Sequence, residues 1–211
     1  NIPAVILLYD IIPLMYPRLS NELHVCAFLN WINIVRSKKV DIMCISKAVA
    51  FEFVTYLKQN HATKCAIKSV GWSHLGSDFF GQAVKPDTCN NSKILGLHHP
   101  FFLSVGTLEP RKAYSVSIDA MELIWKRGID VTFVIVGKYG WSQSALRGRI
   151  TKHSEYNKRL YWFDAASDDE LQYLYSNAFA LLSSSLCEGF GLPVIEAAHY
   201  HLPAIVSDIP V

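Results

Sequence analysis

Two patterns of apolar and polar positions alternate along the chain. Short runs rich in Val and Ile, as in buried strands, are each followed by stretches with apolar residues at helical spacing. Such alternation is typical of a parallel sheet with helices on both faces, so it predicts an α/β fold. The predicted strands are residues 4–10, 40–46, 64–72, 101–106, 130–137, 159–163, 178–184 and 202–208. The predicted helices are residues 22–37, 47–60, 114–128, 144–153, 167–178 and 193–200.

One stretch, residues 76–100, shows neither pattern and gathers Gly, Pro, Asn, Asp and Ser. We interpret it as an interdomain linker between a first domain, residues 1–75, and a second, residues 101–211. The chain starts inside one strand-like run and stops just after another. We therefore expect a fragment whose first domain is incomplete and whose second domain is truncated. An incomplete sheet would leave an open edge and favour aggregation.

Composition narrows the class of protein. Apolar residues make up 51% of the chain and charged residues 18%, which indicates a globular protein with ample core. The net charge of +2 and the lack of a basic patch interleaved with aromatic residues argue against a nucleic-acid partner. Five cysteines without a C-x-x-C pair favour the reducing cytoplasm over a disulfide framework or a zinc site. A peripheral contact with the inner face of a membrane is compatible with this charge, which does not by itself indicate one.

Ligands of parallel α/β sheets bind at the carboxyl ends of the strands, so site residues are expected in the turns there. Arg111 and Lys112 follow the strand 101–106 and are expected at the beginning of the next helix. Cations at a helix N-terminus are unfavourable unless a bound anion is shared with the free N–H groups. The alternative is a pair of solvated side chains on a surface turn. Gly137 is the last residue of the predicted strand 130–137. It suits a close turn beside the same anion, or it is an ordinary turn glycine.

The segment CEGFGLPVIEA, residues 187–197, has two glutamates around two glycines and a proline. Pro193 suits the first position of a helix, and glycines let backbone N–H groups approach a ligand. Glu196 is expected in the first turn of that helix. Carboxylates beside an anion site suit a ligand that carries both phosphates and hydroxyls. The alternatives are a first-turn Glu that complements the helix dipole and, for Glu188, a solvated loop carboxylate.

These residues resemble the retaining glycosyltransferases of family 4. Glu188 and Glu196 enclose seven residues, as in the E-x7-E motif of that family, and LYSNAFALLSSSLCEGFGLPVIEAA is similar to its signature strand and helix. SVGTLEPRK, which contains Gly106, and FVIVGKYGW, which contains Gly137, look like its first two turns, in the form seen among bacterial O-antigen mannosyltransferases. The likeness is strong over residues 101–211 and weaker upstream, in YDIIPLMYP, VDIMCISKAV and HLGSDFF.

The resemblance implies a GT-B architecture, in which two Rossmann-like domains face a cleft. It implies a nucleotide-diphosphate sugar as donor, a glycan or lipid-linked acceptor, and no cofactor or metal ion, in agreement with the absence of a D-x-D sequence. Lys112, with Arg111, is expected to grip the diphosphate, Glu196 the ribose, and Glu188 to lie by the transferred sugar. The backbone of Phe190, Gly191 and Leu192 is expected to contact sugar and phosphate, with Gly106 and Gly137 in the donor-binding turns.

The chain departs from the family pattern at two positions. Thr107 stands where the family often has an arginine, so Arg111 is the expected substitute, and Tyr9 stands where a histidine often precedes Asp10. The implied function is transfer of a hexose, with mannose as the candidate, from the nucleotide sugar with retention of configuration. Two alternatives stay open at this point: a nucleotide-sugar 2-epimerase of GT-B fold and a non-catalytic nucleotide-binding fragment.

Overall fold

The computed structural model describes residues 4–60, 65–76, 91–98 and 100–211. The chain divides into two compact units. The first comprises Asn1–Gly76, Cys187–Gly191 and Ile209–Val211, and the second comprises Ser77–Leu186 and Leu192–Asp208. Most of the predicted linker lies outside the described residues. Its described end includes a short helix, α4 (Ser92–Leu95), whose Ile94 is buried in the second unit's core.

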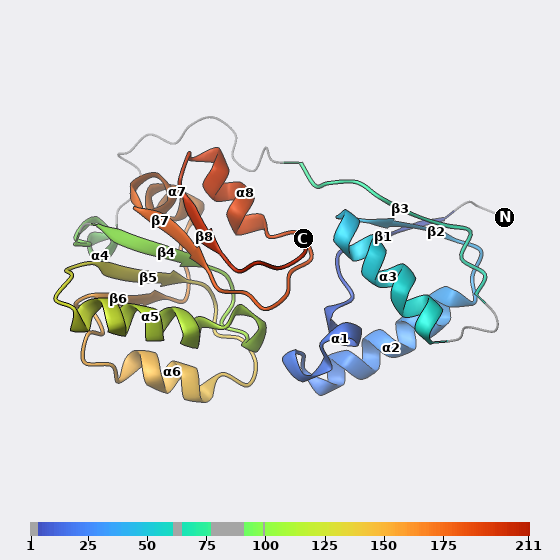
Figure 1. Cartoon of the computed structure of the whole chain (residues 1–211), viewed down its shortest axis with the longest axis horizontal. Coiled ribbons are helices and arrows are strands. Elements are labelled where there is room, and N and C mark those ends of the chain that lie inside the picture. Colours follow the sequence, from blue (N-terminus) through green and yellow to red (C-terminus); the bar gives the residue numbers. More distant parts are fainter. Residues whose placement is uncertain (1–3, 61–64, 77–90, 99) are drawn as a thin grey trace. The chain divides into compact units, whose positions relative to one another are not determined.

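The first unit contains a parallel sheet of β1 (Val5–Leu8), β2 (Asp41–Cys44) and β3 (Ser69–Trp72), in that order. Two predicted helices, α2 (Glu22–Arg36) and α3 (Lys47–Gln59), are confirmed, and Figure 1 shows them on one side of this sheet. Two short elements were not predicted, α1 (Ile12–Met15) and the 3-10 helix η1 (Pro17–Leu19). The Asp10 side chain accepts a hydrogen bond from the Ile12 N–H, 3.0 Å away, which starts the first of them. Asp10 therefore caps a turn.

Within the described residues, helices cover one face of this sheet. Leu8 pairs with Cys44 in the strand register, and both are buried in the core that the two helices complete. Leu7 pairs with Met43 and points to the opposite face, where the two side chains are 50% and 37% exposed. This partial cover agrees with the expectation that the first domain is incomplete. The described residues of this unit supply helices for a single face.

The second unit has a five-stranded parallel sheet in the order β6-β5-β4-β7-β8. The strands, all predicted, are β4 (Phe101–Val105), β5 (Thr132–Val136), β6 (Leu160–Phe163), β7 (Ala180–Ser183) and β8 (Ala204–Val206). The helices are α4, α5 (Tyr114–Lys126), α6 (Ser144–Thr151), α7 (Asp168–Asn177) and α8 (Leu192–His199). Ser167 and Glu170 form a capping box at the start of α7.

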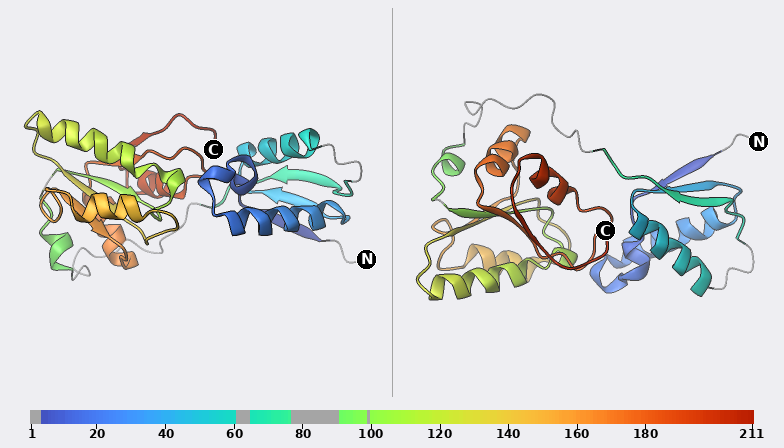
Figure 2. Two further views of the ribbon diagram at one scale, coloured as in Figure 1. Left: turned by 90° about the horizontal axis from the view of Figure 1, so that it is seen from below. Right: turned by 45° about the horizontal axis from the view of Figure 1, so that its top comes forward.

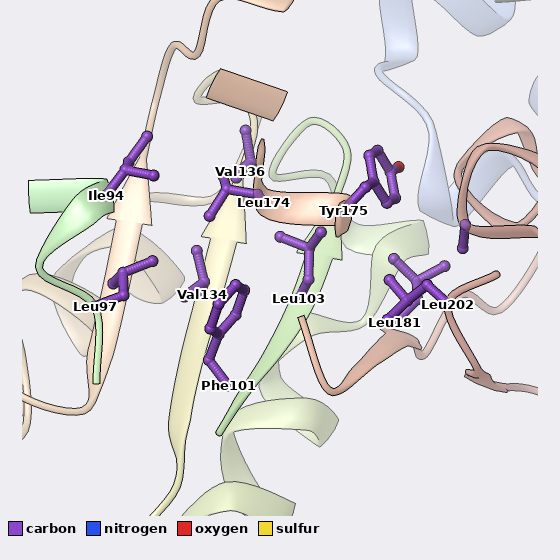
Figure 3. Packing of buried hydrophobic residues seen from close by; sticks show 11 residues of the cluster. Ile94, Leu97, Phe101, Leu103, Val134, Val136, Leu174, Tyr175, Leu181 and Leu202 are labelled. Atoms are coloured by element: carbon purple, nitrogen blue, oxygen red, sulfur yellow. The ribbon is translucent and has the colours of Figure 1, made fainter. Parts of the chain in front are cut away.

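Helices cover both faces of this second sheet, as predicted. Alternate residues of β5 supply the two cores: Val134 faces α4, α7 and α8, and Phe133 faces α5 and α6 (Figures 1 and 2). Figure 3 shows the first of these cores, with Phe101, Leu103 and Leu181 from neighbouring strands. The chain runs outward from β4 to β6 and returns to β7 on the other side of β4. This change of direction is a topological switch point, where open α/β sheets bind ligands.

Candidate functional site

A small polar pocket lies at the switch point, where β4 and β7 end. Its lining includes Ser104 from β4, Ser184 and Ser185 after β7, Lys112 and Pro193 near the start of α8. Strand ends and a helix start thus converge on one cation and several hydroxyl groups. A cation at this place suits an anionic ligand.

Lys112 is the cation of this pocket, and it is only 8% exposed. Its side chain passes over Gly106, the residue that follows β4. A β-carbon on Gly106 would lie 2.9 Å from Lys112 Cε and 3.3 Å from Nζ, and Gly106 has a φ of +142°. The Gly106 carbonyl accepts a 2.6 Å hydrogen bond from the Tyr114 hydroxyl. Residue 106 must therefore be glycine both for its backbone conformation and to leave room for the lysine.

The predicted location of Arg111 and Lys112 in the first turn of a helix is wrong. Both lie in a separate 3-10 helix, η3 (Pro110–Lys112), and α5 begins only at Tyr114. Ala113 between them is left-handed, with φ 47° and ψ 37°, which breaks the helical path. The alternative of two solvated side chains is also wrong. Lys112 is buried, and Arg111 Nε lies 2.9 Å from Glu109 Oε2 with both side chains about three-quarters buried.

Two serines fasten this turn to the end of β7. The Ser184 hydroxyl lies 2.9 Å from the Lys112 carbonyl oxygen and 3.2 Å from that of Ala113, so the two carbonyls share its single proton. Ser117, buried on α5, donates to Ser184 Oγ across 2.8 Å. The left-handed Ala113 is thus held in place by side chains that the sequence analysis did not single out. A run of serines such as SSS does not indicate in the sequence which residues its hydroxyl groups will hydrogen-bond.

Gly137, at the end of β5, is part of the same strand edge. A β-carbon there would overlap the Gly106 carbonyl, so the two glycines bring neighbouring strand ends into direct contact. The Gly106 N–H donates to the Val136 carbonyl, 2.9 Å away, at the same place. Close packing of the two turns accounts for Gly137 by itself.

Glu196 was expected in the first turn of α8, but it does not lie there. The helix begins at Leu192, so Glu196 is its fifth residue and lies beyond the first turn, which contains no acidic residue. The Tyr175 hydroxyl on α7 donates to Glu196 Oε2 across 2.5 Å. Burial first, and then the Glu196 charge, raise the pKa of Tyr175. The helix-dipole interpretation of Glu196 therefore loses its basis, and a tyrosine that the sequence analysis missed becomes its partner.

The residues that were predicted together divide between the two units. Gly106, Lys112 and Gly137 meet at the switch point of the second unit, and Leu192 begins α8. The segment Cys187–Gly191, which holds Glu188, Phe190 and Gly191, belongs to the first unit. There the Gly189 carbonyl accepts a 2.8 Å hydrogen bond from Ser46, the residue that caps α3.

Within the described part of the chain, no group of three or more His, Cys, Asp or Glu side chains is arranged to hold a metal ion. No described helix is both long enough and apolar enough to cross a membrane.

The chain is similar in sequence to known glycosyl transferases. Residues 90–211 match the family model described as "Glycosyl transferases group 1". The chain is 35% identical over 213 residues to a serotype-specific mannosyltransferase, WbdA, of Escherichia coli, which covers 99% of the chain. It is 33% identical over 111 residues to the O-antigen chain mannosyltransferase RfbU of Salmonella typhimurium, covering 53% of the chain and 30% of RfbU. The chain spans about a quarter (26%) of the length of WbdA.

Solved structures show the same fold. Anabaena Alr3699/HepE, solved with UDP and glucose, matches 98% of this chain and 53% of its own with a TM-score of 0.65 at 19% identity. WaaG, a glycosyltransferase involved in lipopolysaccharide biosynthesis, matches 98% of this chain and 57% of its own with a TM-score of 0.63 at 17% identity. The predicted GT-B fold with parallel Rossmann-like sheets is confirmed.

Proposed function

The chain belongs to the group 1 family of glycosyl transferases, and from this premise we propose that it transfers a hexose from a nucleotide-diphosphate sugar to a glycan or lipid-linked acceptor with retention of configuration. WbdA and RfbU, both mannosyltransferases by name, favour mannose as the hexose. The solved complex of HepE with UDP and glucose favours a nucleotide donor in this fold.

The burial of Lys112 at the switch point carries the proposal. When a nucleoside diphosphate leaves the sugar, negative charge grows on the phosphate that is being released. Lys112 lies over Gly106 beside the end of β7, and in this proposal it stabilises that charge as a preorganised donor. Removing one such preorganised donor typically costs about 3–4 kcal/mol of transition-state stabilisation. A same-face substitution then lets the departing phosphate take the proton of the acceptor hydroxyl.

The remaining roles complete the proposed donor site. Arg111 assists Lys112 at the diphosphate, and the N–H groups of Phe190–Leu192 contact phosphate and sugar. Glu196 accepts hydrogen bonds from the ribose, and Glu188 lies by the transferred sugar. We assign no metal ion, because Lys112 and N–H groups supply the positive charge and the sequence has no D-x-D pair. A lipid-linked acceptor would bring the protein to the inner, cytoplasmic face of a membrane.

Nucleotide binding tests the proposal most directly. We expect GDP, UDP or ADP to raise the melting temperature of the 211-residue chain, since a ligand at 100 times its Kd stabilises a protein by about 2.7 kcal/mol. Lys112→Met keeps most of the buried volume and should abolish the shift. Lys152→Met, which removes an exposed lysine, is the matched control.

Turnover of GDP-mannose by the protein as it occurs in the cell, followed by mass spectrometry with an acceptor glycan, tests the reaction itself. Transfer to the acceptor supports the proposal. A 2-epimerised nucleotide sugar would point instead to an epimerase. Binding of nucleotide without any conversion would leave only a nucleotide-binding protein.

A further inference from the structure

The contact between Tyr175 and Glu196 joins two helices that flank β7. The residues are 21 positions apart, and their oxygens are 2.5 Å apart, which is a short distance typical of a hydrogen bond to a charged acceptor. The Tyr175 ring is 1% exposed and packs with Leu174, Leu181 and Leu202 in the core shown in Figure 3, where its hydroxyl points away from Leu103. The ring is thus fixed by the core while its oxygen reaches a partly buried carboxylate.

A second tyrosine steadies the first. The rings of Tyr175 and Tyr200 are stacked with an angle of 2° and a centroid distance of 5.6 Å. The Glu196 charge also contributes to a raised pKa of Tyr200, after burial. Since Tyr175 is protonated at neutral pH, its hydroxyl donates and Glu196 accepts. One carboxylate oxygen, Glu196 Oε2, is therefore held by Tyr175, whose ring is stacked on that of Tyr200.

Holding this carboxylate has a consequence for binding. A glutamate side chain loses about 1.5–2 kcal/mol of rotamer freedom when it is fixed, so a ligand that orders it alone must offset that cost. A carboxylate that the protein has already ordered binds hydroxyl groups with less loss. Because the core fixes Tyr175, the ordering is supplied by folding, before any ligand arrives.

We propose that Tyr175 is a positioning residue for the donor site: it orients Glu196 for the ribose hydroxyls of the bound nucleotide and thereby sets the preference for a ribonucleotide. This inference rests on the proposed function. Tyr175 does not touch the nucleotide in this proposal, and it acts only through Glu196.

Calorimetric titration tests the role of Tyr175. The probes are GDP, UDP and ADP, and the one that binds best is compared with its 2′,3′-dideoxy form. Tyr175→Phe keeps the buried ring and should raise the Kd of the ribonucleotide about tenfold, which corresponds to ~1.4 kcal/mol. It should leave the Kd of the dideoxy form unchanged. Tyr173→Phe, on the same helix and packed against the same core, is the matched control and should bind as the wild type does.

The double variant separates positioning from packing. Tyr175→Phe in the background of Glu196→Ala should change neither Kd further, because the tyrosine then has no acceptor side chain to orient. Equal weakening of the ribonucleotide and the dideoxy form would mean that Tyr175 only supports the fold, and wild-type binding by Tyr175→Phe would also overturn the inference. If the wild-type chain bound none of the three nucleotides, the proposed function itself would fail.

Discussion

Gly106 and Lys112 are in close contact, because Lys112 Cε lies 2.9 Å from the place where residue 106 would carry a β-carbon. The contact fixes the lysine at the edge of the sheet and requires a glycine beneath it. The same glycine accepts the Tyr114 hydroxyl at its carbonyl, so three residues define the place of the ammonium group.

Gly106→Ala should displace Lys112 and weaken nucleotide binding by about tenfold or more, which corresponds to at least ~1.4 kcal/mol. The new methyl group would lie 2.9 Å from Lys112 Cε, and the φ of +142° is unfavourable for alanine. The matched control is Gly148→Ala on α6, where a β-carbon meets nothing within 4 Å. That change should stabilise the chain by about 0.5–1 kcal/mol. Calorimetry and thermal unfolding of both variants measure the contrast, and equal nucleotide affinity in both would contradict it.

Ser184→Ala should destabilise the second unit by about 1–3 kcal/mol, because the carbonyls of Lys112 and Ala113 lose their donor and the buried Ser117 loses its acceptor. Ser117→Ala should cost less. In a double-mutant cycle followed by urea unfolding, the two changes together should cost less than their sum. Additive costs would show that the serines act independently.

The two glutamates should separate in kinetics. In the proposed site Glu196 binds the ribose equally before and during the reaction, whereas Glu188 faces a sugar that gains positive charge as its bond breaks. Glu196→Gln should therefore mainly raise KM and the Kd of the nucleoside diphosphate, and Glu188→Gln should mainly lower kcat. Steady-state kinetics and calorimetry distinguish them. The assignment is reversed if Glu188→Gln alone loses diphosphate affinity, and the motif interpretation fails if neither variant changes.

Acid should weaken the second unit through Glu122. The hydrogen bond from Arg149 lowers the pKa of Glu122 despite partial burial, and a second contact with His153 acts in the same direction. A pKa lowered in the folded state adds stability above its ordinary value of 4.5, and this stability is lost as the pH falls through the lowered value. Glu122→Gln should flatten that loss in urea unfolding between about pH 5 and pH 3.

Glu52 in the first unit provides the comparison of opposite sign. Burial, and then the Asp10 charge, raise its pKa, so ionisation of Glu52 destabilises the folded state. Stability from this group is complete below its ordinary pKa and is lost as the pH rises through the raised one. Glu52→Gln should therefore stabilise the chain at neutral pH, with a gain that fades toward pH 4. A gain for Glu122→Gln at pH 7 would contradict the scheme.

The open sheet face of the first unit should govern association. Leu7 is 50% exposed on this face, and its neighbour Leu8 is 3% exposed on the covered face. Leu7→Lys should reduce self-association, seen by light scattering, with little loss of stability. Leu8→Ala should instead cost about 2–5 kcal/mol of unfolding free energy. Unchanged scattering by Leu7→Lys would place the aggregation-prone surface elsewhere.

Much of the fold was predictable, because each buried strand or helix has a pattern of apolar and polar residues within its own short segment. The run TFVIV is apolar at every position after Thr132, which favours a central strand with helices on both faces. Ser167 and Glu170 likewise marked the start of α7, since a capping box is completed within four residues. The predicted start of α8 was one residue too late. Since the helix begins at Leu192, Glu196 lies beyond the first turn.

The sequence by itself determined the α/β fold, and it pointed to Lys112, Gly106 and Glu196 as candidate site residues. Only the tertiary structure decided how these side chains are held. Lys112 is buried because Gly106 makes room for it, and Glu196 is oriented because Tyr175, 21 residues earlier, reaches it from a neighbouring helix. On α7 that tyrosine has the spacing of an ordinary core residue. Its hydroxyl gains a partner only when α8 packs beside it, and contacts between distant segments leave no local pattern.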